Sequence, residues 1–187
     1  MSDELTKKII GKKAQELREE LQKGKSKGLK RRRAIIGLSL IGMGAMTAVT
    51  LLQTGIVKHL PDPPIDSFDS DKVNSSDTAY ALGTPDGTLS LASLAANIPI
   101  AAFGGENRAE KQPLVPILAA GKSVVEAVAA GWYFYQMPTK EKAWCGYCIV
   151  GALANFGIAA LSLPEAKEAY QTLTESKNRR RTSKETR

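Results

Sequence analysis

The segment "EKAWCGYCIVGALANFGIAAL", residues 141–161, contains the only two cysteines of the chain, Cys145 and Cys148, at the start of a long apolar run. Two cysteines placed at random in a chain of this length would show C-x-x-C spacing only about one time in a hundred, so the spacing is informative. The run from residue 144 to 163, closed by Pro164, is long enough to cross a bilayer as a helix. The segment therefore predicts a membrane helix that carries a dithiol at its beginning.

The dithiol has three interpretations: a redox couple, part of a zinc site, or packed and inert thiols. A structural zinc site needs four nitrogen or sulfur ligands, and His59 is the only other good ligand in the sequence. A zinc site within one chain is therefore not expected, and one shared across a dimer is a weak alternative. Redox chemistry is the favoured interpretation, and inert thiols are the main alternative.

Three other apolar segments precede this one, at residues 34–57, 88–105 and 113–137. The first has no charge and several glycines, and small residues let helices pack closely in membranes. The second is shorter and carries Asn97 and Pro99, but proline is tolerated in a membrane helix when neighbouring groups satisfy the freed carbonyl. The sequence therefore predicts an all-α fold, a four-helix transmembrane bundle.

The third segment contains Lys122 and Glu126, which are four residues apart and so share one helical face. Lone charges in a membrane helix are costly, whereas a pair that is turned inward costs less. We therefore expect the two side chains to face the bundle interior and to pair. If this segment lay in water instead, the chain would be a single-span protein with a soluble helical domain, and that alternative stays open.

Charge at the ends of the apolar segments predicts how the chain crosses the membrane. Basic clusters at residues 30–33 and 178–187 flank the four segments, whereas the connection at residues 58–87 is rich in aspartate. By the positive-inside rule, both termini are expected in the cytoplasm and the connection outside. The net charge of +7 is thus interpreted as a membrane-orienting feature, and no nucleic-acid partner is expected.

This pattern predicts a basic, partly helical cytoplasmic tail at residues 1–33, a membrane domain at residues 34–163 and a second basic cytoplasmic tail at residues 164–187. Within the first tail, residues 4–22 favour an amphipathic helix with charge pairs four residues apart. We interpret it as a solvated tail, with contact to anionic lipid as the alternative. Because it is charged where a signal peptide would be apolar, no cleavage is expected.

The topology puts the dithiol at the outer membrane boundary. In a bacterium that compartment is oxidising, so a disulfide between Cys145 and Cys148 can persist there. Cys145 also precedes a helix, where unpaired amide hydrogens and the helix dipole favour the thiolate. We expect Cys145 to be the more exposed nucleophile, and Cys148, one turn deeper, to resolve a mixed disulfide.

Residues 31–166 resemble the vitamin K epoxide reductase family, especially its small bacterial members. The resemblance rests on "WCGYC" at the start of the last apolar segment, on "NIPIAAFGG" in the second, and on the order of the four spans. It implies a four-helix membrane bundle in which C-x-x-C lies beside a bound quinone and exchanges electrons with it. It also implies a thioredoxin-like partner and a location in the bacterial inner, or cytoplasmic, membrane.

Carried over to this sequence, the resemblance makes Cys145 and Cys148 the catalytic couple, with Cys148 nearest a quinone of the ubiquinone or menaquinone type. It also implies Asn97 as a polar quinone contact. Trp144 and Tyr147 are expected to flank the quinone ring by stacking.

The sequence departs from the family pattern in the outer connection. Family members usually have a second cysteine pair there, which relays electrons between the partner protein and C-x-x-C, but residues 58–87 contain no cysteine. Two hypotheses follow. Either Cys145 and Cys148 exchange directly with the partner, or the chain is a non-catalytic small membrane scaffold or assembly protein on the same fold.

Overall fold

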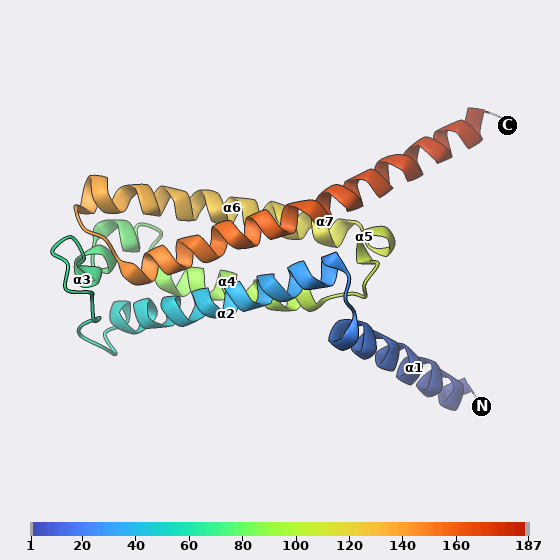
Figure 1. Ribbon diagram of the computed structural model, residues 1–187, viewed down its shortest axis with the longest axis horizontal. Coiled ribbons are helices and arrows are strands. Elements are labelled where there is room, and N and C mark those ends of the chain that lie inside the picture. The colour runs from blue at the N-terminus through green and yellow to red at the C-terminus, as the bar shows by residue number, and fades with distance from the viewer. Residues whose placement is uncertain (1, 186–187) are drawn as a thin grey trace.

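The computed structural model describes the fold of residues 2–185 and the side-chain surroundings of residues 13–176 (Figure 1). Within residues 2–185 the chain is helical and forms no strand, so the prediction of an all-α fold is confirmed. The α-helices are α1 (Ser2–Lys23), α2 (Lys27–Gln53), α3 (Ser70–Asn74), α4 (Asp86–Ala102), α5 (Arg108–Lys111), α6 (Leu114–Gln136) and α7 (Gly146–Glu185). A 3-10 turn, η1 (Asp77–Tyr80), follows α3, and a π-helical turn, η2 (Met137–Glu141), extends α6.

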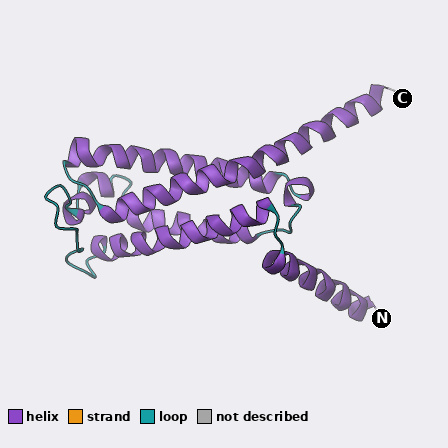
Figure 2. Cartoon of the chain, in the orientation of Figure 1, coloured by secondary structure: helices purple, strands orange, loops and turns teal. Residues whose placement is uncertain are grey.

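Four long helices, α2, α4, α6 and α7, lie side by side and form the bundle (Figure 1). Helix α7 packs against both α2 and α6, and α2 packs against α4, whereas α4 and α6 touch each other much less. The loops and α3 gather at one end of the bundle, and α1 and the last turns of α7 project from the other (Figure 2). Helix α1 agrees with the helix predicted over residues 4–22.

Three of the bundle helices are long and apolar enough to cross a membrane: α2, α6 continued by η2, and the part of α7 from Gly146 to Ser176. Helix α4 has 17 residues. At 1.5 Å per residue it is about 26 Å long, a little shorter than the hydrocarbon core of a typical bilayer at about 30 Å. By length and composition, three candidate spans are therefore present, and α4 is the short member of the bundle.

Small residues let α2 approach its neighbours closely, as the glycines of this segment predict. A Cβ atom at Gly42 would lie 2.9 Å from a methyl carbon of Leu94 on α4 and 3.1 Å from Ala154 on α7. Both distances are too short for a comfortable contact, so only glycine fits there. The helix begins at Ser26, whose hydroxyl accepts a hydrogen bond from the Leu29 amide at 3.2 Å and so caps its first turn.

The prediction that Pro164 closes the last helix is wrong, because α7 continues through this proline to Glu185. Proline removes one helical hydrogen bond, but tertiary contacts can hold a helix straight through it. Here the next residue, Glu165, is buried and accepts two hydrogen bonds from Arg108, each 2.7 Å long. The Arg32 guanidinium lies against the same carboxylate at 3.9 Å and also donates to the Phe103 carbonyl at 3.1 Å.

Residues 58–87 look like a polar connection in the sequence, yet they fold back over the end of the bundle. Ser70 and Asn74 of α3 are buried there. The Asp62 carboxylate accepts from both the amide and the hydroxyl of Ser70, at 2.7 and 2.6 Å, and so fixes the start of α3. We call residues 58–87 the cap. The Trp144 amide donates to the Ser67 carbonyl at 2.8 Å, which ties the cap to the residues that precede α7.

Candidate functional site

The two cysteines lie at the start of α7, beneath the cap. Cys145 immediately precedes the helix, and Cys148 lies in its first turn; both are free thiols. The Cys148 amide donates to the Cys145 sulfur at 3.1 Å. The first amides of a helix have no partner within the helix, and here one of them bonds to the thiol. Cys145 is fully buried and Cys148 is only partly buried. The expectation that Cys145 is the more exposed thiol is therefore wrong, because α3 covers the start of α7.

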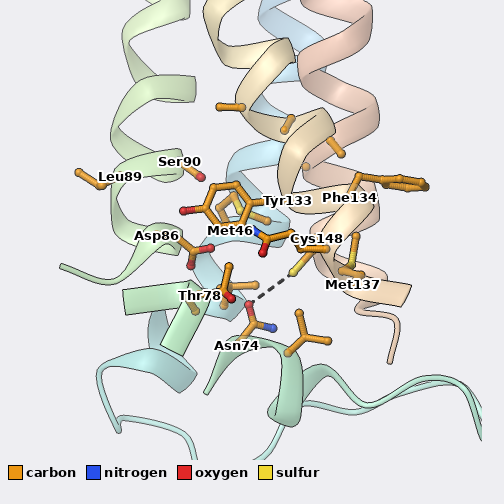
Figure 3. A pocket seen from close by; sticks show the side chains of 18 of the residues that line it. Met46, Asn74, Thr78, Asp86, Leu89, Ser90, Tyr133, Phe134, Met137 and Cys148 are labelled. Carbon is orange, nitrogen blue, oxygen red and sulfur yellow. Dashed lines mark hydrogen bonds between the residues drawn. The ribbon is translucent and has the colours of Figure 1, made fainter. Parts of the chain in front are cut away.

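One amide side chain, Asn74 at the end of α3, bonds to both sulfurs. Its nitrogen donates to the Cys145 sulfur at 3.2 Å, and its oxygen accepts from the Cys148 thiol at 3.4 Å, the contact drawn as a dashed line in Figure 3. The same nitrogen also donates to the Ser70 carbonyl at 2.7 Å, and Gln53 of α2 donates to the Asn74 carbonyl at 3.3 Å. Asn74 is thus held from two sides and links the cap to the dithiol.

These hydrogen bonds favour the thiolate form of Cys145. The hydrogen bond with Cys148 is the largest cause of a lowered pKa of the Cys145 thiol, and burial opposes this change. Hydrogen bonds from Ser70, Asn74 and the Cys148 amide lower the pKa further. Together they lower the pKa of the Cys145 thiol from 9.0 to about 7. A thiol with this pKa is partly ionised near neutral pH, and the thiolate is the reactive form in thiol–disulfide exchange.

A cavity of about 390 Å³ opens beside Cys148, enclosed by α2, α4, α6, α7 and the cap. Its walls are mostly apolar, with Met46 and Val49 from α2 and Phe134 and Met137 from the α6 side. The volume and the apolar walls with a few polar groups are typical of a small-molecule site. Cys148 lines this cavity, and Figure 3 shows its sulfur between the cap residue Asn74 and the bundle helices.

Polar side chains on α4 form a stripe along the cavity wall. Asp86, Ser90 and Ser93 are separated by four and then three residues, a spacing that places them on one helical face. Figure 3 shows Asp86 and Ser90 on α4, with the Tyr133 ring of α6 extending toward them. Asp86 accepts a hydrogen bond from Gln53 at 2.6 Å. An otherwise apolar cavity is thus provided with oxygen atoms on one wall.

The predicted pair of Lys122 and Glu126 is confirmed, with the ammonium 2.5 Å from the carboxylate. Lys122 also donates to the Ser93 carbonyl and to the Asn97 side-chain oxygen, both at 2.9 Å, so the pair bridges α6 and α4. Glu126 and Ser93 line the cavity, and the Ser93 hydroxyl donates to the Glu126 carboxylate. Of the pair expected to face the interior, Glu126 therefore reaches the cavity wall.

Of the residues predicted to form the site, Cys148 lines this cavity, and the others lie around it. Asn97 is buried beside Lys122. Trp144 packs against Phe134 with ring centres 5.3 Å apart, and the Tyr147 hydroxyl donates to a backbone carbonyl of the cap at 3.0 Å. The cavity wall includes none of Asn97, Trp144 and Tyr147. Their contact with a bound ring stays a prediction, and Phe134 offers an aromatic face inside the cavity.

Sequence reasoning missed Asn74, Asp86 and Tyr133. The polar stripe is visible in the sequence, because Asp86 begins a series of polar positions at helical spacing within an apolar segment. A weaker signal precedes Asn74, because Asp69 is a residue type that favours a helix N-cap. In the structure its side chain does accept from the Lys72 amide, at 2.9 Å. Nothing in the sequence, however, indicates that this short helix lies on the dithiol.

Outside the bundle, His59 and Asp71 make an exposed ion pair within the cap, with 2.5 Å between Nδ1 and the carboxylate. The hydrogen bond to Asp71 raises the pKa of His59 above 6.5. Although partial desolvation opposes the change, hydrogen bonds from His59 and the Leu60 amide lower the pKa of Asp71 below 3.8. The Leu60 amide is 2.9 Å from the carboxylate, so Asp71 joins the loop after α2 to α3.

Comparison with known families agrees with this architecture. The model of the vitamin K epoxide reductase family matches residues 33–163, which include the bundle helices, the cap and the dithiol. A search of curated proteins gave no significant match.

Proposed function

Because the chain belongs to the vitamin K epoxide reductase family, we propose that it is a membrane thiol–disulfide oxidoreductase that exchanges two electrons between Cys145, Cys148 and a quinone. One observation carries this proposal. The Cys148 sulfur lies in the wall of a mostly apolar cavity, and Asn74 bonds to this sulfur and to that of Cys145. A couple that must react with a flat apolar molecule needs one sulfur beside an apolar cavity and the second within reach of the first.

The cavity fits a quinone of the ubiquinone or menaquinone type. Its volume of about 390 Å³ is large enough for a quinone head group of one or two fused rings. Phe134 supplies an aromatic face, and Tyr133 supplies a hydroxyl for a ring oxygen. A quinone, when bound, provides the acceptor or donor of two electrons and two protons.

The protein's own part of the reaction is the closing or opening of a disulfide. When it closes, the two S–H bonds of Cys145 and Cys148 break and one S–S bond forms, which releases two electrons and two protons toward the cavity. The lowered pKa of Cys145 supplies a thiolate for this step. Asn74 holds the two sulfurs in place while the protons leave.

A thioredoxin-like protein is the proposed partner, and it exchanges with Cys145. Because this sulfur is fully buried beneath α3, exchange requires the cap to move away. The bonds that such a movement would open include those from the Trp144 amide to the Ser67 carbonyl and from the Tyr147 hydroxyl to the Pro61 carbonyl. With no cysteine in residues 58–87, the partner meets the dithiol without a relay.

The membrane arrangement proposed here has four spans, with α4 as the short fourth one, in the bacterial inner membrane. Residues 34–163 form the membrane domain, and residues 1–33 and 164–187 are cytoplasmic tails. Both ends of the chain leave the bundle on the side of α5, where Arg32 and Arg108 are buried (Figure 1). The positive-inside rule supports a cytoplasmic location for that side.

The test is purification from membranes, followed by quinone extraction and titration of thiols before and after addition of a quinone. Cys145→Ser and Cys148→Ser should each abolish quinone-dependent thiol loss, whereas Ser162→Ala, on α7 outside the cavity, should not. Cys148→Ser should also trap a partner as a mixed disulfide on Cys145. If no quinone copurifies, no partner is trapped and neither serine variant changes thiol loss, the chain is a scaffold.

A further inference from the structure

The end of the cavity remote from the cap, which we call the deep end, is lined by Ser93, Glu126 and Asn155. Ser93 donates to Glu126, and Lys122 pairs with the same carboxylate at 2.5 Å. The Asn155 side chain, by contrast, makes no hydrogen bond with any of residues 13–176, whose surroundings are described. The deep end thus presents a free amide next to a carboxylate.

A free amide at this depth calls for a partner from outside the protein. Asn155 lies on α7, in a candidate membrane span. Within the hydrocarbon layer no bulk water replaces a missing hydrogen bond, so an unpaired amide is unfavourable. Its neighbours on the α7 wall of the cavity, Gly151 and Ala152, offer no side-chain acceptor. A ligand oxygen in the cavity would supply the missing bond.

The two polar ends of the cavity lie well apart. Cys148 and Asn155 are seven residues apart on α7, which is about 10.5 Å along the helix axis. A ligand that reaches both ends therefore carries polar atoms on opposite sides of its ring.

We infer that Asn155 and Glu126 are a second anchor, which binds the ring oxygen remote from the thiols. This inference rests on the proposed function. Asn155 donates an N–H to the carbonyl oxygen of the oxidised ring. Glu126 accepts the O–H of the reduced ring, and Lys122 and Ser93 hold its carboxylate in place. One residue therefore serves each redox state, while the Tyr133 hydroxyl binds the opposite oxygen.

The experiment measures binding rather than turnover. Purified protein in lipid nanodiscs is titrated with ubiquinone-1, a short-chain para-quinone, and quenching of tryptophan fluorescence gives the dissociation constant; ubiquinol-1 is measured by competition. Asn155→Leu should weaken quinone binding about tenfold, the effect of one lost hydrogen bond, and change quinol binding less. Glu126→Gln should weaken quinol binding by a similar factor.

Two control variants separate ligand binding from damage to the bundle. Lys122→Gln removes the cation that holds the Glu126 carboxylate, so it should weaken quinol binding and leave quinone binding within about twofold of wild type, whereas damage to the bundle would weaken both. Ser123→Ala removes a buried hydroxyl of α6 outside the cavity and should change neither constant.

Three outcomes would overturn the inference. If Asn155→Leu and Glu126→Gln bind both ligands as wild type does, while Tyr133→Phe weakens binding, the second anchor is wrong and the proposed function stands. If Lys122→Gln and Glu126→Gln each weaken quinone and quinol binding equally, the ion pair is structural and the Glu126 contact is wrong. If the wild-type protein binds no quinone, the proposed function and the second anchor fail together.

Discussion

Buried polar clusters lie at both ends of the helix bundle, and they differ in the strength and the surroundings of their bonds. We call the first the arginine cluster; its members are Arg32, Arg108 and Glu165. We call the second the thiol cluster; its members are Cys145, Cys148 and Asn74. The arginine cluster is charged and tightly packed, whereas the thiol cluster is held by long bonds to sulfur and borders a cavity.

In the arginine cluster, both bonds from Arg108 to Glu165 are 2.7 Å long. The guanidinium nitrogens donate to oxygen atoms, and the Nε atom of Arg32 is the exception. In the thiol cluster the bonds to sulfur are 3.1 to 3.4 Å long. Short charge-assisted bonds fix one geometry. Weaker bonds beside a cavity leave the thiols able to exchange partners, so the comparison separates a structural end from a reactive end.

The largest expected effect comes from breaking the arginine cluster. Glu165→Leu leaves two buried guanidinium groups without a counter-charge, and loss of one partner from a buried pair typically destabilises by about 3–5 kcal/mol. Thermal unfolding in detergent, followed by circular dichroism, measures the loss. Below its melting temperature the variant should keep the wild-type alkylation rate of Cys148.

A matched control is available one turn along α7. Glu168 pairs with Arg31 at 3.7 Å and is mostly exposed, so Glu168→Leu should change stability by less than about 1 kcal/mol. Equal losses in Glu165→Leu and Glu168→Leu would mean that burial does not distinguish the two pairs. A loss of thiol reactivity in Glu165→Leu would mean that the two ends are coupled.

The next effect concerns the reactive end. Asn74→Leu removes the amide that bonds to both sulfurs, so the pKa of Cys145 should rise from about 7 toward its ordinary value. Because the thiolate is the alkylated form, iodoacetamide should label Cys145 several-fold more slowly at pH 7. Peptide mass spectrometry across pH 5–10 gives the midpoint for each cysteine separately.

The control for this variant is Ser76→Ala. The Ser76 hydroxyl lies in the same cap and donates to the Val73 carbonyl at 2.8 Å, without touching a sulfur. It should leave the midpoint unchanged. An unchanged midpoint in Asn74→Leu would show that the helix start and Cys148 alone set the pKa of Cys145.

The sequence is sufficient to predict the features that depend on neighbours along one helix. Apolar length predicts the long helices, C-x-x-C spacing predicts that both thiols share one turn, and four-residue spacing predicts the Lys122–Glu126 pair. Features that depend on distant segments are not predicted. Asn74 lies 71 residues from Cys145, and its contact depends on how the cap folds.

The same distinction explains the two wrong expectations. The order of thiol exposure fails because α3 covers Cys145, which helix periodicity within α7 cannot indicate. The helix end at Pro164 fails because Glu165 is anchored by Arg108, 57 residues away along the chain. In both cases a tertiary contact overrides a local rule.

A smaller effect tests whether the cap must move for Cys145 to react. Asp62→Ala removes the carboxylate that bonds to the amide and hydroxyl of Ser70 at the start of α3. Loss of a hydrogen bond of this kind typically costs about 1 kcal/mol, so α3 should open about fivefold more often. Alkylation of Cys145 should accelerate by a similar factor, while that of Cys148 changes little.

Asp66→Ala is the matched control, because Asp66 is exposed in the same segment and accepts no side-chain hydrogen bond from the residues whose surroundings are described, 13–176. It should leave both alkylation rates unchanged. If Asp62→Ala leaves Cys145 as protected as in wild type, movement of α3 is not the route to this thiol.

The smallest expected effect is the pH dependence of the cap through His59 and Asp71. The pKa of His59 is raised, so its contribution is complete below pH 6.5 and is lost as pH rises through the raised value. The pKa of Asp71 is lowered, so its contribution is complete above pH 3.8 and is lost as pH falls through the lowered value. The cap should therefore be most stable between these two pH values.

Amide hydrogen exchange of α3, corrected for the intrinsic rate, measures this effect from pH 4 to 9. Wild-type protection should decline above neutral pH, and His59→Gln should remove the decline while leaving exchange in the middle of α7 unchanged. The change should be small because His59 is fully exposed to solvent, where screening weakens ion pairs. If His59→Gln shows the wild-type decline, the pH response of the thiol end arises from Cys145 rather than from the cap. The cap and the dithiol would then respond to pH independently.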